Sequence, residues 1–275
     1  MAQDDAGGGP PQPIALSPTL FLDTNGIHYL RLSVSLAETN GQKIIGMDLD
    51  RFRILLKSAD IPKHSADHYE RGFNIGRYLA KRAKDDRACA QYAPVSGFEL
   101  LCGGLRGSAI VNAASGHVPH RWYSRMGEAE LLHYLHPGDF EKNYSDCLSM
   151  PDLFQGQLGF TLGEADEREL GRVFELSKSI LKATYLELGD CLVYASAMLA
   201  RAEAVITCDA HLANVIRWVH TPPEAKSEFA EQFKRANRII LDGLAAILEV
   251  PPSQALLPKA LAITDIKKTL AGVIP

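Results

Sequence analysis

This sequence of 275 residues has little excess of either charge, few cysteines and no long apolar run. The 29 basic and 33 acidic side chains give a formal charge of -4, which argues against a surface coated in Lys and Arg for non-specific binding of polyanions. The longest apolar stretch, Cys191 to Ala200, has about half the length needed to cross a bilayer, so we expect no membrane span. No internal repeat is visible.

The cysteines and the N-terminal segment favour a cytoplasmic protein. The five cysteines include no C-x-x-C pair, and their odd number leaves at least one unpaired, as is typical of reduced thiols in the cytosol. Residues 1–15 are rich in Gly, Pro and Gln and have neither the basic start nor the apolar run of a signal peptide. We therefore expect residues 1–15 to form a disordered N-terminal tail.

The composition is that of a globular protein, with 46% hydrophobic and 23% charged residues. These values exclude whole-chain disorder, a collagen-like rod and a small disulfide scaffold. A chain of this length can sustain one large hydrophobic core.

Short apolar runs alternate with helix-period segments along the chain. The runs at 19–22, 91–95 and 204–208 predict buried strands, and this alternation indicates a parallel α/β sheet. Helical patterns lie at residues 27–34, 44–61, 68–84, 98–114, 126–135, 164–188, 191–202, 210–219, 224–248 and 261–270. The glycines and prolines of residues 136–163 predict a loop-rich interval.

Three aspartates stand at one edge of the predicted sheet. Asp23 and Asp209 each follow the end of a predicted strand, and Asp190 begins an apolar helix. Because the carboxyl ends of parallel strands meet at one edge, we expect these carboxylates to lie within a few ångströms of one another. Like charges so close require a neutralising cation, and an all-oxygen ligand set favours Mg²⁺ or Mn²⁺ over zinc. Singly, each aspartate also suits a helix N-cap.

Three segments resemble the acidic motifs of PIN-domain ribonucleases. Segment 20–25 (LFLDTN) resembles their opening strand, whose first metal-binding aspartate is followed by Thr or Ser and often by Asn. Segment 189–197 (GDCLVYASA) resembles their third acidic motif, and segment 205–209 (VITCD) resembles the fourth, a strand that ends in Thr-x-Asp. The spacing of 19 positions between Asp190 and Asp209 suits the family.

The resemblance implies a fold and an activity. The fold would be a PIN-like three-layer α/β/α domain over residues 16–220, with a central parallel sheet, extra helical insertions and a helical C-terminal extension at 221–275. The activity would be that of a hydrolase, a metal-dependent endoribonuclease that binds one or two Mg²⁺ or Mn²⁺ ions through four acidic side chains and cleaves RNA phosphodiesters.

The second acidic residue of the family is a Glu near the start of the helix that follows the second strand. Glu99 follows a clear strand directly, whereas Glu130 has the more usual Ser-to-Glu spacing, and we favour Glu99. With Asp23 and Asp209 as direct ligands, Asp190 and the Glu would complete the shell or position water. Asn25 and Thr207 would orient the carboxylates.

The expected partners are RNA and, by the resemblance, other proteins. Arg121 and Arg125 with Trp122 between them could bind a phosphate and stack an unpaired base, although such residues more often pack or face solvent. The resemblance to small bacterial toxins of the family also admits an antitoxin or another protein inhibitor, and a homodimer.

Two other functions compete with the ribonuclease. The loop Asp23-Thr24-Asn25-Gly26 partly resembles the nucleophile loop of aspartyl-phosphate phosphohydrolases, in which the residue two after the nucleophile is a second Asp; here it is Asn25. A PIN-like domain can also serve as a non-catalytic RNA-binding or assembly module with a structural acidic pocket.

Overall fold

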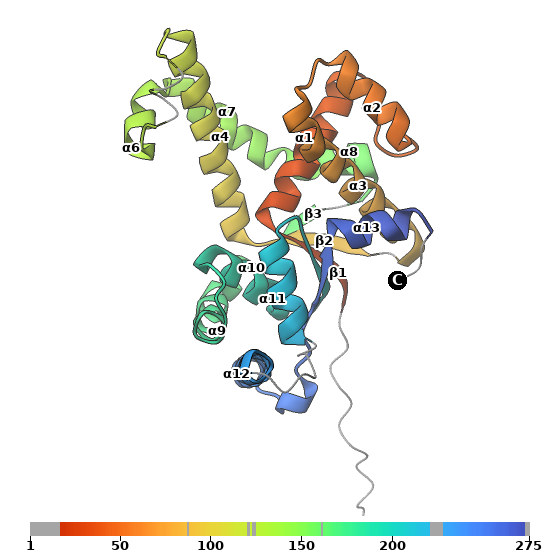
Figure 1. Ribbon diagram of the computed structural model, residues 1–275, viewed down its shortest axis with the longest axis vertical. Coiled ribbons are helices and arrows are strands. Elements are labelled where there is room, and N and C mark those ends of the chain that lie inside the picture. Colours follow the sequence, from red (N-terminus) through yellow and green to blue (C-terminus); the bar gives the residue numbers. More distant parts are fainter. Residues whose placement is uncertain are drawn as a thin grey trace, which may run out of the picture.

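A five-stranded parallel sheet lies at the centre of the protein (Figure 1). The computed structural model describes residues 17–86, 88–119, 122, 125–160, 162–220 and 228–272. The strand order is β3-β2-β1-β4-β5, and every neighbouring pair is parallel. The strands are β1 (Ser17–Leu22), β2 (Cys89–Tyr92), β3 (Leu162–Glu164), β4 (Ala202–Thr207) and β5 (Lys259–Ala262).

Strand β1 is central because both of its faces are apolar. Leu20 and Leu22 point to one face of the sheet and Phe21 points to the other, and all three are fully buried. Leu22 is in register with Tyr92 of β2 and Ile206 of β4, so the carboxyl ends of these three strands meet at one edge. A strand buried on both sides reads as a continuous apolar run, as the sequence predicted.

Helices cover both faces of the sheet, which is the layered arrangement of an α/β/α fold. One face carries α1 (Thr24–Thr39), α2 (Leu49–Ser58), α3 (Lys63–Asp86), α8 (Met150–Leu158) and α13 (Ile263–Leu270). The other carries α9 (Leu170–Ala183), α10 (Leu188–Leu199), α11 (Ala210–His220) and α12 (Glu228–Leu248). None of the helices in the described ranges combines the length and the apolar character of a membrane span.

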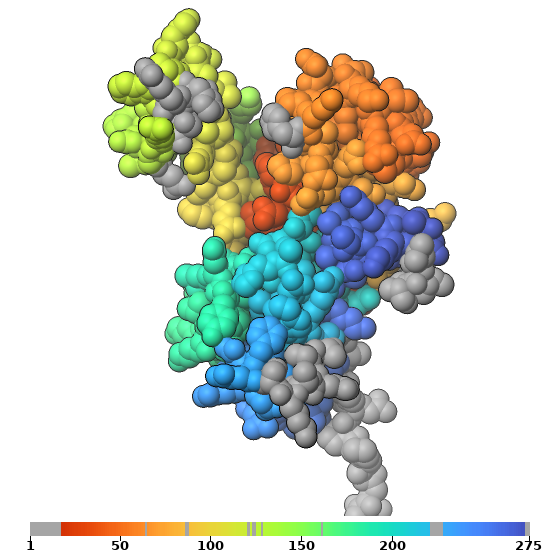
Figure 2. Space-filling model, in the orientation of Figure 1, coloured from red at the N-terminus to blue at the C-terminus, as the bar shows by residue number. Residues whose placement is uncertain are grey.

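A helical arm projects from the sheet on the side of α1. It consists of α4 (Pro94–Ser115) with α6 (Glu128–Leu131), the short helix Leu132–Tyr134 and α7 (Pro137–Leu148) packed along it (Figure 1). Figure 2 shows a hollow between this arm and the lobe made by α2 and α3, with α1 on its floor.

The interval 136–163 is mostly helical, so the loop-rich prediction was wrong. Its prolines lie in the first turns of α7 and α8, where a missing N–H costs nothing, instead of interrupting a helix. Gly159 ends α8 with a left-handed φ of 68°. Proline and glycine often mark loops, but in this interval they mark two helix starts and a helix end.

The C-terminal segment is more than the expected helical extension. Strand β5 pairs with β4 through the whole length of β5, so residues after 221 complete the sheet. Helix α12 packs against α9, and α13 packs against α3. At the other end of the chain, the expected disordered tail of residues 1–15 lies outside the described residues.

Candidate functional site

The four acidic side chains of the predicted site line one cavity at the carboxyl edge of the sheet, together with a fifth acid, Glu187. Asp23 and Asp209 follow β1 and β4, Glu99 lies in the second turn of α4, and Asp190 lies in the first turn of α10. The cavity has a volume of about 370 Å³. Its lining comprises Asp23, Thr24, Asn25, Glu99, Glu187, Gly189, Asp190, Val193, Asp209 and His211.

Asp23 is fixed on both of its carboxylate oxygens. It is the N-cap of α1, and its Oδ1 accepts a hydrogen bond of 2.5 Å from the N–H of Gly26, while its Oδ2 accepts one from the hydroxyl of Thr207. A Cβ at position 26 would lie 2.8 Å from Oδ1, so this cap requires a glycine. The Asp23 side chain is only 4% exposed.

Burial and neighbouring charges make two of these carboxylates weak acids. Burial raises the pKa of Asp23 to about 7; the hydrogen bonds from Thr207 and Gly26 oppose the change, and the charges of Asp190 and Asp209 add to it. Burial also raises the pKa of Asp190 to about 6, with the charges of Asp209, Glu187 and Glu99 adding to it. The site therefore holds more negative charge than its surroundings neutralise.

Thr207 connects Asp23 to Asp209. Its hydroxyl donates to Asp23 and accepts a hydrogen bond of 2.9 Å from the backbone N–H of Asp209. The Asp209 carboxylate in turn accepts hydrogen bonds from the N–H groups of His211 (2.6 Å) and Leu212 (3.2 Å) at the start of α11. Both aspartates thus cap a helix and face the cavity at once, so the cap and the site are not exclusive alternatives.

Glu99, and not Glu130, lies with the three aspartates. The Thr24 hydroxyl contacts both the Glu99 carboxylate and the Ser96 hydroxyl, the latter at 3.0 Å. A Cβ on Gly189 would lie 3.0 Å from Oε1 of Glu99, which places this carboxylate against the start of α10.

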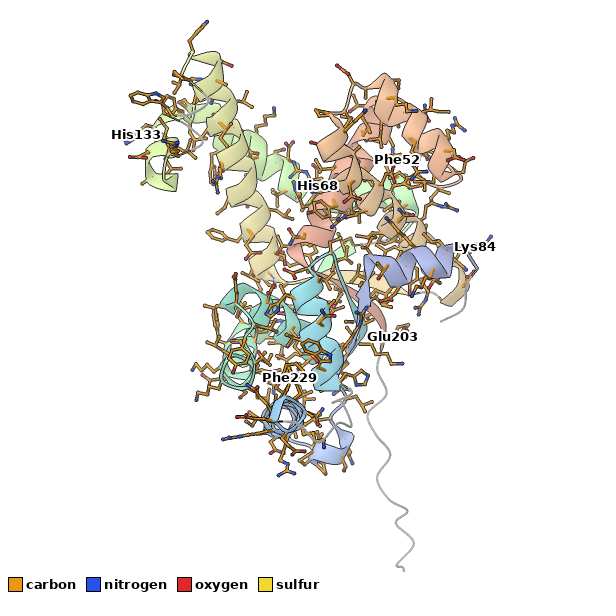
Figure 3. All side chains as sticks on the ribbon, viewed as in Figure 1. Phe52, His68, Lys84, His133, Glu203 and Phe229 are labelled. Atoms are coloured by element: carbon orange, nitrogen blue, oxygen red, sulfur yellow. The ribbon has the colours of Figure 1, made fainter. Side chains whose placement is uncertain are left out.

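Glu130 lines a separate cavity of about 710 Å³ on the helical arm, together with Trp122 and Arg125. His133, which lines the same cavity, is labelled at the tip of the arm in Figure 3. The structure therefore keeps Trp122 and Arg125 apart from the four acids. Arg121 lies outside the described residues.

Three polar side chains of the cavity lining were missed by the sequence analysis as site residues: Thr24, Glu187 and His211. Each stands within three positions of an acid that was identified, so proximity in sequence was the available signal. Asn25 lines the cavity, and Thr207 lies beneath it in contact with Asp23. These are the positions that an orienting role requires.

The carboxylate oxygens of the cavity are ligands of the kind that a hard divalent cation prefers. The acids offer only oxygen ligands, and the lining described above contains neither Lys nor Arg to neutralise them. In the arrangement seen, however, no three His, Cys, Asp or Glu side chains of the described residues stand close enough together to hold an ion. Holding an ion would therefore require the acidic side chains to move closer together, and of the four predicted acids Glu99 is the exposed one.

No known family model, no curated protein and no solved structure matches this chain. The functional argument therefore rests on the chain's own residues.

Proposed function

We propose that this protein is a PIN-like endoribonuclease that depends on Mg²⁺ or Mn²⁺. One observation carries the proposal: four carboxylates from separate elements line a single cavity at the carboxyl edge of a parallel sheet. Burial there raises the pKa values of Asp23 and Asp190, and neighbouring carboxylates add to the rise. In open parallel sheets this edge is where ligands bind. Such a cluster of acids is costly to the fold unless a cation compensates it.

The roles of the residues follow from how firmly each is held. Asp23 and Asp209 are fixed by hydrogen bonds from backbone N–H groups and from Thr207, which suits them to be direct ligands. Asp190 and Glu99 line the same cavity and would complete the shell or hold the attacking water. The bound cation would make that water a better nucleophile and stabilise the charge that develops on the phosphate.

The reaction itself is a hydrolysis. A water oxygen bonds to phosphorus as the water gives up a proton, the bond from phosphorus to one ribose oxygen breaks, and that oxygen takes up a proton as it leaves. His211 lines the cavity and acts electrostatically on Asp190, so its imidazole lies within the charged environment of the site.

The residue two positions after Asp23 disfavours the aspartyl-phosphate alternative. Asn25, which cannot act as a general acid, occupies the place of the second Asp.

Metal-dependent cleavage is the direct test. Labelled single-stranded and structured RNA would be incubated with Mg²⁺, Mn²⁺ or EDTA, using the wild type and the variants Asp23→Asn and Asp209→Asn. We expect cutting that needs the metal and falls at least 100-fold in both variants. Glu130→Gln is the matched control, because it removes a carboxylate from the other cavity.

The outcomes separate the candidate functions. Loss of cutting in both aspartate variants but not in Glu130→Gln would support the ribonuclease. No cutting together with no metal-induced rise in melting temperature would overturn it in favour of a non-catalytic module. A phosphorylated Asp23 trapped during turnover would establish the phosphohydrolase instead.

A further inference from the structure

A row of three aromatic rings, made by His28, Tyr29 and His68, lies where α3 packs on α1. Tyr29 of α1 stacks on His68 of α3, with ring centroids 4.7 Å apart and planes 10° from parallel. His28 precedes Tyr29 in α1, and the centroids of these two rings are 5.7 Å apart with their planes tilted by 54°. Figure 3 shows His68 where α3 lies beside α1, between the helical arm and the α2–α3 lobe.

Close packing of α3 on α1 fixes this row. A Cβ on Gly72 would lie 1.8 Å from the carbonyl oxygen of Tyr29, so only a glycine allows the two helices to approach so closely. The buried Ser33 hydroxyl contacts the carbonyl oxygens of Tyr29 (3.0 Å) and Tyr69 (2.6 Å), one on each helix. His68, one turn before Gly72, is thereby held over the Tyr29 ring.

The row adjoins the acidic site. Asn25 of α1 lines the cavity, and His28 and Tyr29 follow it by three and four positions, one turn further along the same helix. Tyr29 is half-buried, whereas His28 and His68 are exposed, so the two histidines present surface to solvent. A ligand whose phosphate reaches the cavity would therefore have an adjoining group within reach of the rings.

One cationic side chain lies beside the row. Arg71 of α3, three positions after His68, acts electrostatically on Tyr29. Arg71 also pairs with Asp67 at 2.5 Å, so part of its charge is already balanced and electrostatics alone would bind a phosphate weakly. Ring surface next to modest positive charge suits a nucleic-acid strand better than a free phosphate.

We propose that the row His28, Tyr29 and His68 stacks an unpaired base of single-stranded RNA, next to the phosphodiester that lies in the carboxylate cavity. This inference rests on the proposed function, because it assigns that site its substrate class. A paired base in an A-form helix offers no free face, so the row selects single strands. Stacking of this kind tolerates any base sequence.

The test measures stacking separately from cutting. A ten-nucleotide single-stranded RNA carries one 2-aminopurine, whose fluorescence falls when it stacks on an aromatic ring, and binding is measured in the Asp23→Asn background. We expect the double variant His28→Ala/His68→Ala to bind about tenfold more weakly and to lose the quenching. Tyr29→Phe keeps the ring and should bind as the parent does. His220→Ala, at the far end of α11, is the matched histidine control.

Each outcome bears on one proposal. Unchanged binding and quenching in the double variant would overturn the stacking site, as would tight, equally ring-dependent binding of a duplex of the same length. Quenching that disappears in Trp122→Ala, while the histidine variants keep it, would overturn the site by assigning the base to the arm. If the wild type, with Asp23 intact, cuts no RNA but the quenching still depends on the rings, the stacking site would be supported and the proposed nuclease activity overturned.

Discussion

Replacing Asp23 by Asn should stabilise the metal-free protein above neutral pH. Burial raises the pKa of Asp23 from 3.8 to about 7, so the folded state binds this proton more tightly than the unfolded chain does. Stability from this group is present at pH 4, falls as the pH rises between 4 and 7, and is lost above pH 7, where the folded protein holds a buried charge. A pKa difference of this size corresponds to roughly 4 kcal/mol, as an upper bound.

The Asn side chain retains what the structure needs at this position. Its Oδ1 can accept the hydrogen bond from Gly26, and its Nδ2 can donate to the Thr207 hydroxyl, which still accepts from the backbone of Asp209. Asn is as good an N-cap as Asp. The substitution therefore removes the buried charge and leaves the start of α1 intact.

Unfolding followed by circular dichroism in EDTA, at pH 5 and pH 8, measures the effect. We expect Asp23→Asn to melt roughly 10 °C above the wild type at pH 8 and to show less than half of this gain at pH 5. Mn²⁺ should raise the melting temperature of the wild type at pH 8 and have little effect on the variant. Asp48→Asn, which changes the exposed N-cap of α2, is the matched control and should give no such gain.

Two results would refute this reasoning. If the variant and the wild type lose the same stability between pH 5 and pH 8, the buried charge of Asp23 is not what destabilises the fold. If the variant is less stable at both pH values, the negative charge at the start of α1 stabilises the helix more than its burial costs.

Three further substitutions test the geometry of the site. Thr207→Val should cost about 1–3 kcal/mol in the free energy of unfolding, because it removes one of the two hydrogen-bond donors to the buried Asp23 carboxylate; an unchanged denaturant midpoint would contradict this. Gly26→Ala should cost about 1–2 kcal/mol in the same assay, since the new Cβ meets Oδ1 of Asp23, and a gain in stability would show that the cap adapts. Glu99→Gln should weaken Mn²⁺ binding about tenfold by calorimetry, while Glu130→Gln leaves it unchanged; equal effects would remove Glu99 from the site.

The sequence by itself determined the centre of the sheet and three of the four acids. Strands β1 and β4 are buried on both faces, so they read as continuous apolar runs, and each ends in a conspicuous aspartate. Parallel pairing then brings Asp23 and Asp209 to one edge without further information. Asp190 was found because it opens the most apolar helix of the chain.

The tertiary structure decided the edges of the sheet and the identity of the fourth acid. Strands β3 and β5 are edge strands of three and four residues, and β5 is half-exposed, so neither has enough apolar character to stand out in the sequence. Glu99 and Glu130 both begin helical segments, and only the direction in which α4 leaves the sheet sends one to the cavity and the other to the arm. Stacking of His68 on Tyr29 likewise joins residues from two helices, which depends on the packing at Gly72. Local patterns determine which residues follow a strand, but contacts between distant segments are set by how whole helices pack.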